Sequence, residues 1–366
     1  MNKILFNGFY GFENTGDDAF VEIASWGNHT YWKNENPAFF SGATLPNTIH
    51  KINKIYPSTS SKIIQKLSVF KESLNANYFI NAGGSVFSEI RPFSDIVFAQ
   101  KAGLLNSKLN HGAIGVSIGP FANSEKEKKV VEYLKTLQFL ALRDTESYNY
   151  ALSLNLDYKP INAFDLAALL PVCYESYNPE LSNKNRKVIG ISVCNYERYF
   201  GGDIENEKRR NNFIKETISL LSKNSNYYFK FFIFNGNSEI GDEKITHEMA
   251  CVLNKNQFEI VPYLGDTFKA WKEIKTCDFM LSTRLHASIF SCYANVPFML
   301  VEYHRKCTDF LNDIGYDNNI RVFDGLKDPK ETSLAIENVL NGQYNVPTNI
   351  EETISRAKRN FTEVQL

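Results

Sequence analysis

The sequence lacks long apolar runs, an excess of charge of one sign, and closely spaced cysteines. No run of about 18 apolar residues occurs, so no segment is expected to span a bilayer as a helix. The 40 basic residues are balanced by 41 acidic ones, and no basic run is long enough to follow a phosphate backbone. This balance excludes the usual signature of a nucleic-acid-binding protein. The first residues do not have the layout of a signal peptide.

The six cysteines form neither close pairs nor the spacing of a metal-ligand set. Reduced thiols in a cytoplasmic protein are the simplest interpretation, and we expect no bound metal and no cofactor. Peripheral contact with the cytoplasmic face of the inner membrane is compatible with this composition. The oligomeric state is not indicated by the sequence.

A length of 366 residues suits two domains rather than one core. Short apolar strands alternate with helical patterns from Ile4 to Leu170, and the alternation restarts at Val188 after a polar, turn-forming segment. We therefore predict an α/β fold with two Rossmann-like, doubly wound domains, 1–173 and 188–366, joined by a linker at 174–187. In such sheets the loops at the carboxyl ends of the strands bind ligands, so we expect a site in a cleft between the domains.

The most informative stretch is a predicted strand, helix and strand over residues 279–301. Arg284 and His286 follow the first strand at a helix N-terminus, where backbone N–H groups favour an anion. The loop after the second strand adds His304, Arg305 and Lys306. Because parallel strands end at the same edge of a sheet, both cationic loops should converge on a small, highly charged anion. The alternative is that Arg284 is a surface residue and His286 a helix cap.

A second candidate region follows the strand predicted at Ile4–Phe6. Its loop carries Gly8, Gly11 and Gly16, and two carboxylates, Asp17 and Asp18, open the next helix. The spacing is not the dinucleotide fingerprint, and adjacent carboxylates would repel a pyrophosphate. Carboxylates suit a polyhydroxyl ligand, since they accept hydrogen bonds from hydroxyls and can withdraw a proton. The alternative is that Asp17 or Asp18 only caps its helix. Another predicted strand, 78–80, ends near Gly83 and Gly84.

With these motifs together, the chain resembles the polysaccharide pyruvyl transferase family over nearly its whole length. The matching segments, in order, are Gly8–Ala19, Ala82–Gly84, Ser117–Pro120, Arg143–Asp144 with Ser147, Asp165, Arg284–Ala287, Val296–Pro297 and Tyr303–Lys306. Gly83–Gly84 is a shorter glycine run than many members of the family carry, and three single positions also depart from the family pattern. Asp18 stands where a glutamate is common, Cys194 stands where an arginine often follows the first strand of the second domain, and His304 stands where an aspartate is usual.

The resemblance implies a glycosyltransferase-B-like fold, phosphoenolpyruvate as donor, and a sugar hydroxyl pair in a lipid-linked surface-polysaccharide precursor as acceptor of a cyclic pyruvate ketal. It assigns the donor to Arg284, Leu285, His286, Lys306 and Arg198, with Arg143 as a further cation. It assigns the acceptor to Gly11, Asn14, Gly16, Asp17, Asp18, Gly83 and Gly84. Arg284 and His286 would be catalytic with Asp17, the expected base, and Asp18 would be a cap or supporting residue. Other candidates for the base are Glu89, Asp165 and His304.

Two other functions share the predicted fold. A glycosyltransferase that uses a nucleotide sugar would need a carboxylate for the ribose, and Glu302 is the candidate. A non-catalytic glycan-binding protein is the second alternative, and the presence of both Arg284 and His286 argues against it.

Overall fold

The computed structural model describes residues 2–35, 37–41, 44–56, 61–176 and 186–366. The chain forms two compact units, the first from Met1–Phe12, Asp17–Cys173 and Glu351–Leu366, the second from Glu13–Gly16 and Tyr174–Ile350. Within the predicted linker, residues 177–185 lie outside the described part of the chain.

Two segments belong to a different unit from the one the sequence suggested. The C-terminal helix α14 (Ile350–Thr362) packs on the first unit, where the Asn360 side chain accepts from the Gly115 N–H (2.7 Å) and donates to the Phe164 carbonyl (2.9 Å). The short segment Glu13–Gly16 packs on the second unit. Both assignments come from contacts between residues far apart in sequence, which a strand-and-helix pattern does not report.

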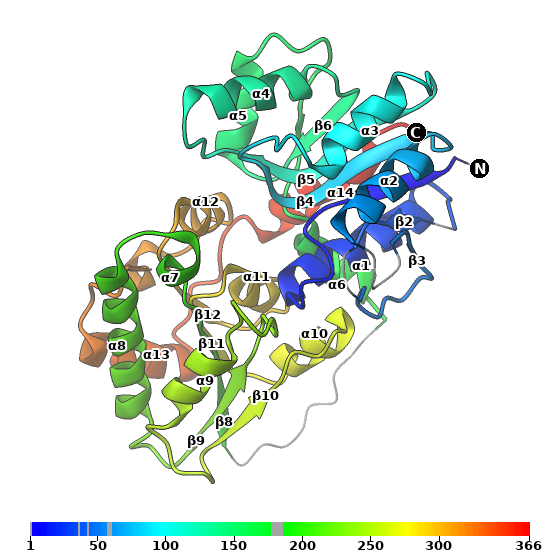
Figure 1. Cartoon of the computed structure of the whole chain (residues 1–366). Helices are drawn as coiled ribbons and strands as arrows, with labels where there is room; N and C mark the ends of the chain where they lie inside the picture. The colour runs from blue at the N-terminus through cyan, green and yellow to red at the C-terminus, as the bar shows by residue number, and fades with distance from the viewer. Residues whose placement is uncertain (1, 36, 42–43, 57–60, 177–185) are drawn as a thin grey trace. The chain divides into compact units, whose positions relative to one another are not determined.

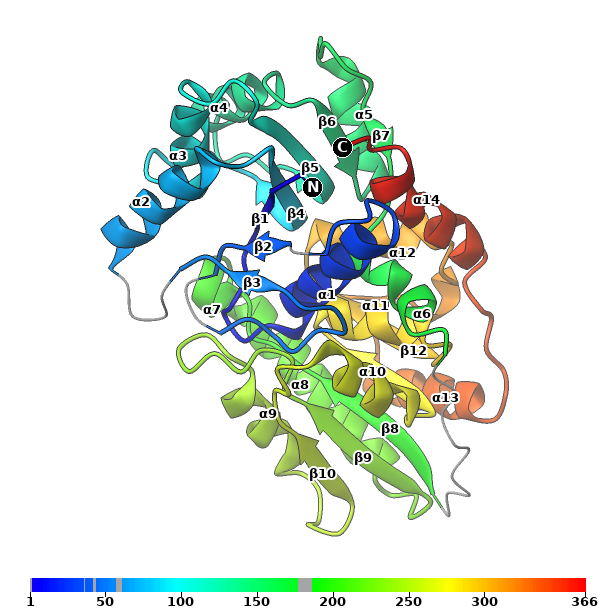
Figure 2. The ribbon, with the colours of Figure 1, turned by 90° about the vertical axis from the view of Figure 1, so that its right-hand side faces the viewer.

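The first unit is a parallel sheet covered by helices on both faces (Figures 1 and 2). In the described residues it has seven strands in the order β3-β2-β1-β4-β5-β6-β7. Helices α2 to α5 share one apolar core with the sheet, while α1, η1 and α14 cover the other face. The elements are β1 (Ile4–Asn7), α1 (Thr15–Thr30), β2 (Ala38–Phe39), β3 (Asn53–Lys54), α2 (Lys62–Ser73), β4 (Tyr78–Phe87), α3 (Asp95–Gly103), β5 (Asn110–Ile118), α4 (Ser124–Leu134), β6 (Phe139–Leu142), α5 (Thr145–Ser153), β7 (Ile161–Asn162), η1 (Leu166–Leu169) and α6 (Leu170–Cys173).

The second unit repeats this design with six strands among the described residues, in the order β10-β9-β8-β11-β12-β13 (Figure 1). On one face of this sheet, Phe279 and Leu281 of β11 pack with residues of α8, α9 and α13. Beyond the end of β9, Phe234 packs on Phe290 of α11. The elements are β8 (Lys187–Ser192), α7 (Glu197–Phe200), α8 (Ile204–Leu221), β9 (Tyr227–Phe232), α9 (Glu243–Ala250), β10 (Phe258–Val261), α10 (Thr267–Lys275), β11 (Phe279–Ser282), α11 (Leu285–Tyr293), β12 (Phe298–Glu302), α12 (Arg305–Asp313), η2 (Asn318–Ile320), β13 (Val322–Phe323) and α13 (Pro329–Leu340).

The strand order reverses once in each sheet, and these reversals locate the expected ligand sites. In the first sheet the reversal lies between β1 and β4, and in the second between β8 and β11. A crevice at such a reversal, outside the carboxyl ends of the strands, is the usual ligand site of an open parallel sheet. The loop after β1 carries Gly8 and Gly11 and leads into α1, whose first turn holds Gly16 and Asp17. The loop after β11 carries Arg284.

The predicted fold class, two parallel-sheet α/β domains, is confirmed by this topology. One strand end was wrong: β4 does not stop before Gly83 and Gly84 but continues through them to Phe87, with a shift in its pairing to β5. A glycine pair normally interrupts a strand, but here the irregular pairing accommodates it. Within the described residues, no helix is both long and apolar enough to cross a membrane.

Candidate functional site

Arg284 lies at the sheet reversal of the second unit, where it caps α11 and forms a bidentate pair with Asp242. Its Nε donates to Asp242 Oδ2 (2.8 Å) and its Nη2 donates to Asp242 Oδ1 (2.5 Å). The Asp242 side chain is 1% exposed and that of Arg284 is 19% exposed. Asp242 also accepts from the backbone N–H of Asn235 (3.0 Å), which fixes the loop after β9. The sequence did not single out Asp242, although it orients the central cation.

The charges of this pair depend on each other. Burial opposes the charged form of Arg284, but the carboxylate of Asp242 outweighs burial and raises the pKa of the guanidinium. The guanidinium therefore stays charged, and its orientation is fixed from one side. No protein acceptor contacts its Nη1 among the described residues, so this nitrogen is the one available to an anionic ligand.

The segment 13–16 reaches the same part of the second unit and packs against His286. The Thr15 N–H donates to the Phe234 carbonyl (2.9 Å), and Asn14 forms an isolated bridge with Asn235. A Cβ on Gly16 would lie 2.3 Å from His286 Nδ1, so only glycine leaves room for this imidazole. The structure thus brings Asn14, Gly16, Arg284 and His286 together.

Asn14 also determines how α1 begins. Its side-chain oxygen accepts from the Gly16 N–H (3.0 Å), one residue after the helix starts at Thr15. The cap is therefore Asn14 rather than Asp17 or Asp18, which both lie in the first turn. The two carboxylates there complement the positive end of the helix dipole.

Lys306 follows β12 and lies among aromatic rings. Its Nζ is 5.5 Å from the ring centroid of Tyr196 and 5.7 Å from that of Tyr303, while its backbone N–H donates to His304 Nδ1 (3.2 Å). Burial, together with the charges of Lys306 and Arg305, lowers the pKa of His304 to about 4. His304 is therefore a neutral helix cap at pH 7, not a cation for the donor.

Tyr303 connects this lysine to the arginine. It is close enough to Arg284 and to Cys194 for both groups to influence the pKa of its hydroxyl. Burial raises the pKa of Tyr303 well above its usual range, so it stays a neutral phenol. Neither Tyr303 nor Tyr196 was predicted as a site residue, yet Tyr303 lies close to both Arg284 and Lys306, and the Tyr196 ring packs against it with centroids 5.0 Å apart.

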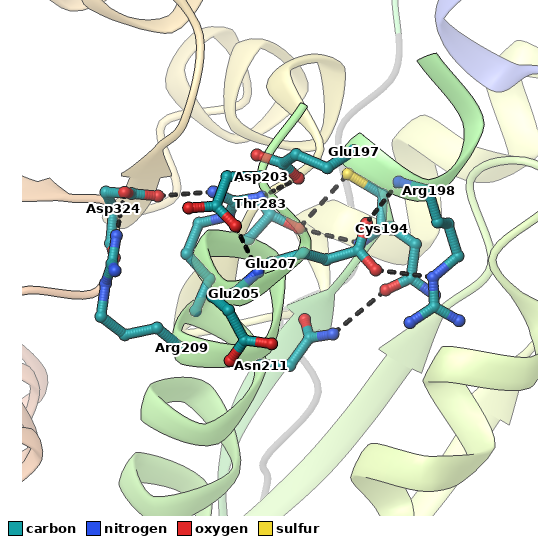
Figure 3. A network of polar contacts seen from close by, with 12 residues as sticks. Cys194, Glu197, Arg198, Asp203, Glu205, Glu207, Arg209, Asn211, Thr283 and Asp324 are labelled. Carbon is teal, nitrogen blue, oxygen red and sulfur yellow. Dashed lines mark hydrogen bonds and ion pairs between the residues drawn. The ribbon is translucent and has the colours of Figure 1, made fainter. Parts of the chain in front are cut away.

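The connection from β8 to α8 holds Arg198, another of the predicted donor cations (Figure 3). Arg198 is exposed, and its Nε donates to Glu207 (2.6 Å), whose carboxylate is fully buried. The Cys194 N–H donates to Thr283 Oγ1 (2.8 Å). Arg198 is thus anchored at one nitrogen and exposed at the rest of its head group.

A buried network of ion pairs lies next to this connection and contacts the ring of Tyr303. Arg210 pairs with Glu197 through one nitrogen and with Asp324 through the other, and its guanidinium lies 5.3 Å from the Tyr303 ring centroid. Arg209 also pairs with Asp324 (Figure 3). A buried, multiply bonded network of this kind restricts the loops that it joins.

In the first unit, the Arg143 guanidinium is surrounded by protein hydrogen-bond acceptors and is not open to a ligand. Its guanidinium donates to Ser117 Oγ (2.7 Å), Asp165 Oδ2 (2.9 Å) and Ser85 Oγ (3.0 Å). Ser117 in turn donates to Asp144 Oδ2 (2.6 Å). Three of the segments that resemble the family therefore form one polar network, and neither Arg143 nor Asp165 is positioned as a free cation or base.

The remaining acceptor candidates lie around the reversal between β1 and β4. Gly83 has φ +78°, and a Cβ there would lie 2.2 Å from Cγ of Phe20, so glycine is required by both backbone and packing. Gly84 and Gly11 also have positive φ. Asp18 is buried and Asp17 is half-buried, and the negative charge of Asp17 adds to burial in raising the pKa of Tyr10.

Two exposed aromatic rings on the loop between β1 and α1 were not predicted. Phe9 and Phe12 are 55% and 40% exposed, and their rings stack with centroids 4.2 Å apart. Glu89, the other candidate base, is half-buried, and a hydrogen bond from Lys126 and another from Arg91 lower its pKa. The pair of rings could have been suspected from the sequence, because phenylalanine is unusual in a glycine-rich loop.

A family model for polysaccharide pyruvyl transferase matches residues 7–305. The chain belongs to this family. The resemblance drawn from the motifs is therefore confirmed, and the match includes both sheet reversals and every proposed donor residue except Lys306. A comparison with proteins of curated function found no match.

Solved structures with a similar fold are enzymes of UDP-sugars. They include Staphylococcus aureus MnaA with UDP (TM-score 0.61, 10% identity, covering 99% of this chain and 92% of that one) and Neisseria meningitidis UDP-GlcNAc 2-epimerase bound to UDP-GlcNAc (0.59, 9%, 99% and 99%). The UDP-GlcNAc 2-epimerase of Methanocaldococcus jannaschii is similar too (0.59, 10%, 97% and 97%). These neighbours confirm the glycosyltransferase-B-like fold, and at such low identity they show the fold alone.

Proposed function

We propose that this family member transfers the pyruvate group of phosphoenolpyruvate to two hydroxyls of a sugar in a surface-polysaccharide precursor, with release of phosphate. The observation that carries the proposal is Arg284, which is half-buried, oriented by Asp242, and located beside His286 at the sheet reversal of a pyruvyl transferase chain. The acceptor is proposed to be lipid-linked, and the donor needs no additional cofactor.

The donor residues match the charge of phosphoenolpyruvate, which carries a phosphate and a carboxylate on three carbons. Arg284 offers Nη1, the first turn of α11 offers the backbone N–H groups near Leu285 and His286, and Lys306 adds a point charge. Arg198 is a further cation, since Glu207 holds only its Nε end. Tyr303, kept neutral by burial, can bind a ligand oxygen without adding negative charge.

The reaction requires one proton donor, one proton acceptor and stabilisation of the leaving phosphate. The first sugar oxygen bonds to the central carbon of phosphoenolpyruvate and its hydroxyl proton passes to the base, while the methylene carbon takes a proton from the acid. The bond from the central carbon to the phosphate oxygen then breaks, and phosphate leaves with the electron pair. The second hydroxyl closes the ring and gives up its proton. We propose that His286 donates the proton to the methylene carbon. Arg284 and Lys306 stabilise the leaving phosphate.

The acceptor is assigned to the reversal of the first sheet, where Asp17 is the proposed base. Its carboxylate can accept a hydrogen bond from a sugar hydroxyl, with Gly83, Gly84 and Gly11 allowing close approach of the backbone. Asp18 is too buried to be the primary contact and supports the helix start. The stacked Phe9 and Phe12 rings offer an apolar surface of the kind that packs against a pyranose.

Transfer from a nucleotide sugar is the second candidate, because the similar solved structures include enzymes bound to UDP or UDP-GlcNAc. The carboxylate that would hold a ribose is already occupied. Glu302 is 2% exposed and accepts from Arg321 at both oxygens (2.9 and 2.6 Å) and from Thr308 (2.8 Å). This arrangement favours phosphoenolpyruvate over a nucleotide sugar.

The deciding experiment is incubation with phosphoenolpyruvate and a panel of lipid-linked or aryl galactosides, glucosides and N-acetylmannosaminides. We expect phosphate release and an acceptor whose mass has increased by one pyruvyl unit less water. Release of a nucleoside diphosphate from a sugar nucleotide, with phosphoenolpyruvate unchanged, would instead establish glycosyl transfer. Binding of a glycan without turnover of either donor would indicate a non-catalytic protein.

Variants of Arg284 test the donor site directly. Arg284→Lys keeps the charge but loses the fork to Asp242, and a charge-assisted hydrogen bond contributes roughly 1.5 to 3 kcal/mol. The affinity for phosphoenolpyruvate should fall by roughly tenfold or more. Arg186→Lys is the matched control, because this arginine precedes β8 at the opposite edge of the same sheet. Unchanged donor affinity in both Arg284→Lys and Arg284→Ala would place the anion elsewhere.

A further inference from the structure

The solvent face of α2 and the ends of α3 expose large apolar side chains that the first unit does not use. On α2, Ile63, Ile64 and Leu67 are 64%, 50% and 58% exposed. We call the whole set the α2–α3 face: Ile63, Ile64, Leu67, Phe93, Leu104 and Leu105. Isolated exposed apolar residues are common on soluble proteins, but a group of this size on two neighbouring helices calls for an explanation.

The two helices lie side by side, so these residues form one region of the surface. Lys66 Nζ on α2 contacts Asp95 Oδ1 at the start of α3 (2.5 Å). Beyond the end of α3, Asn106 Nδ2 donates to the carbonyls of Ser73 (3.1 Å) and Ala76 (2.8 Å) at the end of α2. Both views of the ribbon show α2 and α3 adjacent on the outside of the first sheet (Figures 1 and 2).

Folding of α2 does not require the exposed residues. Its inward positions Val69 and Ser73 are buried, and Phe70 and Leu74 pack against the core of the first unit. The helix therefore has a complete inner face and a second apolar stripe on its outer side. Since burial provides most of the stability of a surface helix, the outer stripe contributes little to the fold.

The charge of this region favours an anionic partner. From Lys62 to Lys108 there are six basic and three acidic residues, a net charge of +3 in a chain whose net charge is −1. Each of the three carboxylates already has a cation: Glu72 pairs with Lys3 (2.6 Å), Asp95 with Lys66 (2.5 Å) and Glu89 with Lys126 (2.7 Å). Lys71, Lys101 and Lys108 are exposed to solvent.

We infer that the α2–α3 face docks peripherally on an anionic lipid bilayer. Aliphatic side chains flanked by lysines are typical of helices that lie in the membrane interface, where the apolar groups enter the acyl boundary and the cations meet head groups. Protein interfaces instead deplete lysine and enrich arginine, so this composition fits lipid better than a protein partner. The docking is independent of the proposed reaction and concerns only the first unit.

The test measures sedimentation of the full chain with vesicles of phosphatidylcholine alone or mixed with phosphatidylglycerol. Binding should require the anionic lipid and weaken as salt is added. The variant Ile63→Ser/Ile64→Ser/Leu67→Ser should lower partitioning by roughly tenfold or more, with unchanged circular dichroism. The control is Phe323→Ser/Leu326→Ser/Leu334→Ser, which removes three equally exposed apolar side chains from the second unit and should bind as the unchanged protein does.

Several results would overturn the inference. One is that the protein sediments with neither kind of vesicle, and another is that the α2 variant binds as well as its control. A dimer that the α2 variant converts to a monomer, without any lipid binding, would mean that a second copy covers this face. If the serine variant does not fold, the variant Lys62→Glu/Lys71→Glu tests the inference instead. It leaves the apolar stripe intact and should reduce binding only to vesicles that contain anionic lipid.

Discussion

Replacing Asp242 by asparagine should destabilise the second unit by about 3 kcal/mol, through the loss of two charge-assisted hydrogen bonds to Arg284. The side chains have nearly the same shape, so the main change is removal of the counter-charge. The arginine is 19% exposed and cannot regain full hydration without moving its loop. A matched control is Asp309→Asn, whose partner Arg305 is on the surface, and its cost should stay below about 1 kcal/mol.

The assay is urea unfolding of Asp242→Asn, Arg284→Gln and the double variant, combined in a double-mutant cycle. We expect a coupling energy of roughly 2 to 3 kcal/mol, because either single change leaves the other partner buried without an opposite charge beside it. Asp242→Asn should also weaken phosphoenolpyruvate binding, since the guanidinium is no longer oriented. Additive losses in the cycle, with donor affinity unchanged, would refute the claim that Asp242 positions Arg284.

Three further predictions test other parts of the chain. Gly16→Ala should displace His286 and lower the melting temperature, by an overpacking cost of about 1 to 3 kcal/mol, and adding His286→Ala should recover the stability but not the activity. Arg143→Lys should destabilise the first unit by roughly 3 kcal/mol in denaturant unfolding, because Asp165 stays buried with a poorer partner. Loss of turnover without loss of stability would instead mean that Arg143 binds the substrate. Burial lowers the pKa of His111 from its ordinary 6.5 to about 4, so the unfolded chain binds the proton more readily and stability should fall as pH drops from 6.5 to 4, by up to about 3 kcal/mol. In His111→Phe this part of the pH profile, measured by thermal melting, should be flatter.

Much of the second unit could be predicted from its sequence because its strands are short, apolar and separated by clear helical patterns. The strand, helix and strand predicted over residues 279–301 are β11 (Phe279–Ser282), α11 (Leu285–Tyr293) and β12 (Phe298–Glu302). The two-residue strands β2, β3, β7 and β13 were not foreseen, since two residues carry no periodicity. Helix α2 was also not foreseen, because its apolar outer stripe weakens the amphipathic pattern.

The sequence by itself determined the family, the fold class and the identity of the cationic loop at Arg284 and His286. Local signals were enough for these, because motif order and hydrophobic period are properties of neighbouring residues. The tertiary structure alone decided which charges remain available to a ligand. Asp242 is 42 residues from Arg284 and Asp165 is 22 residues from Arg143, yet each carboxylate fixes its arginine in a buried pair. Only folding brings such partners within hydrogen-bond distance, and burial then makes their pairing strong enough to orient one arginine and to occupy the other.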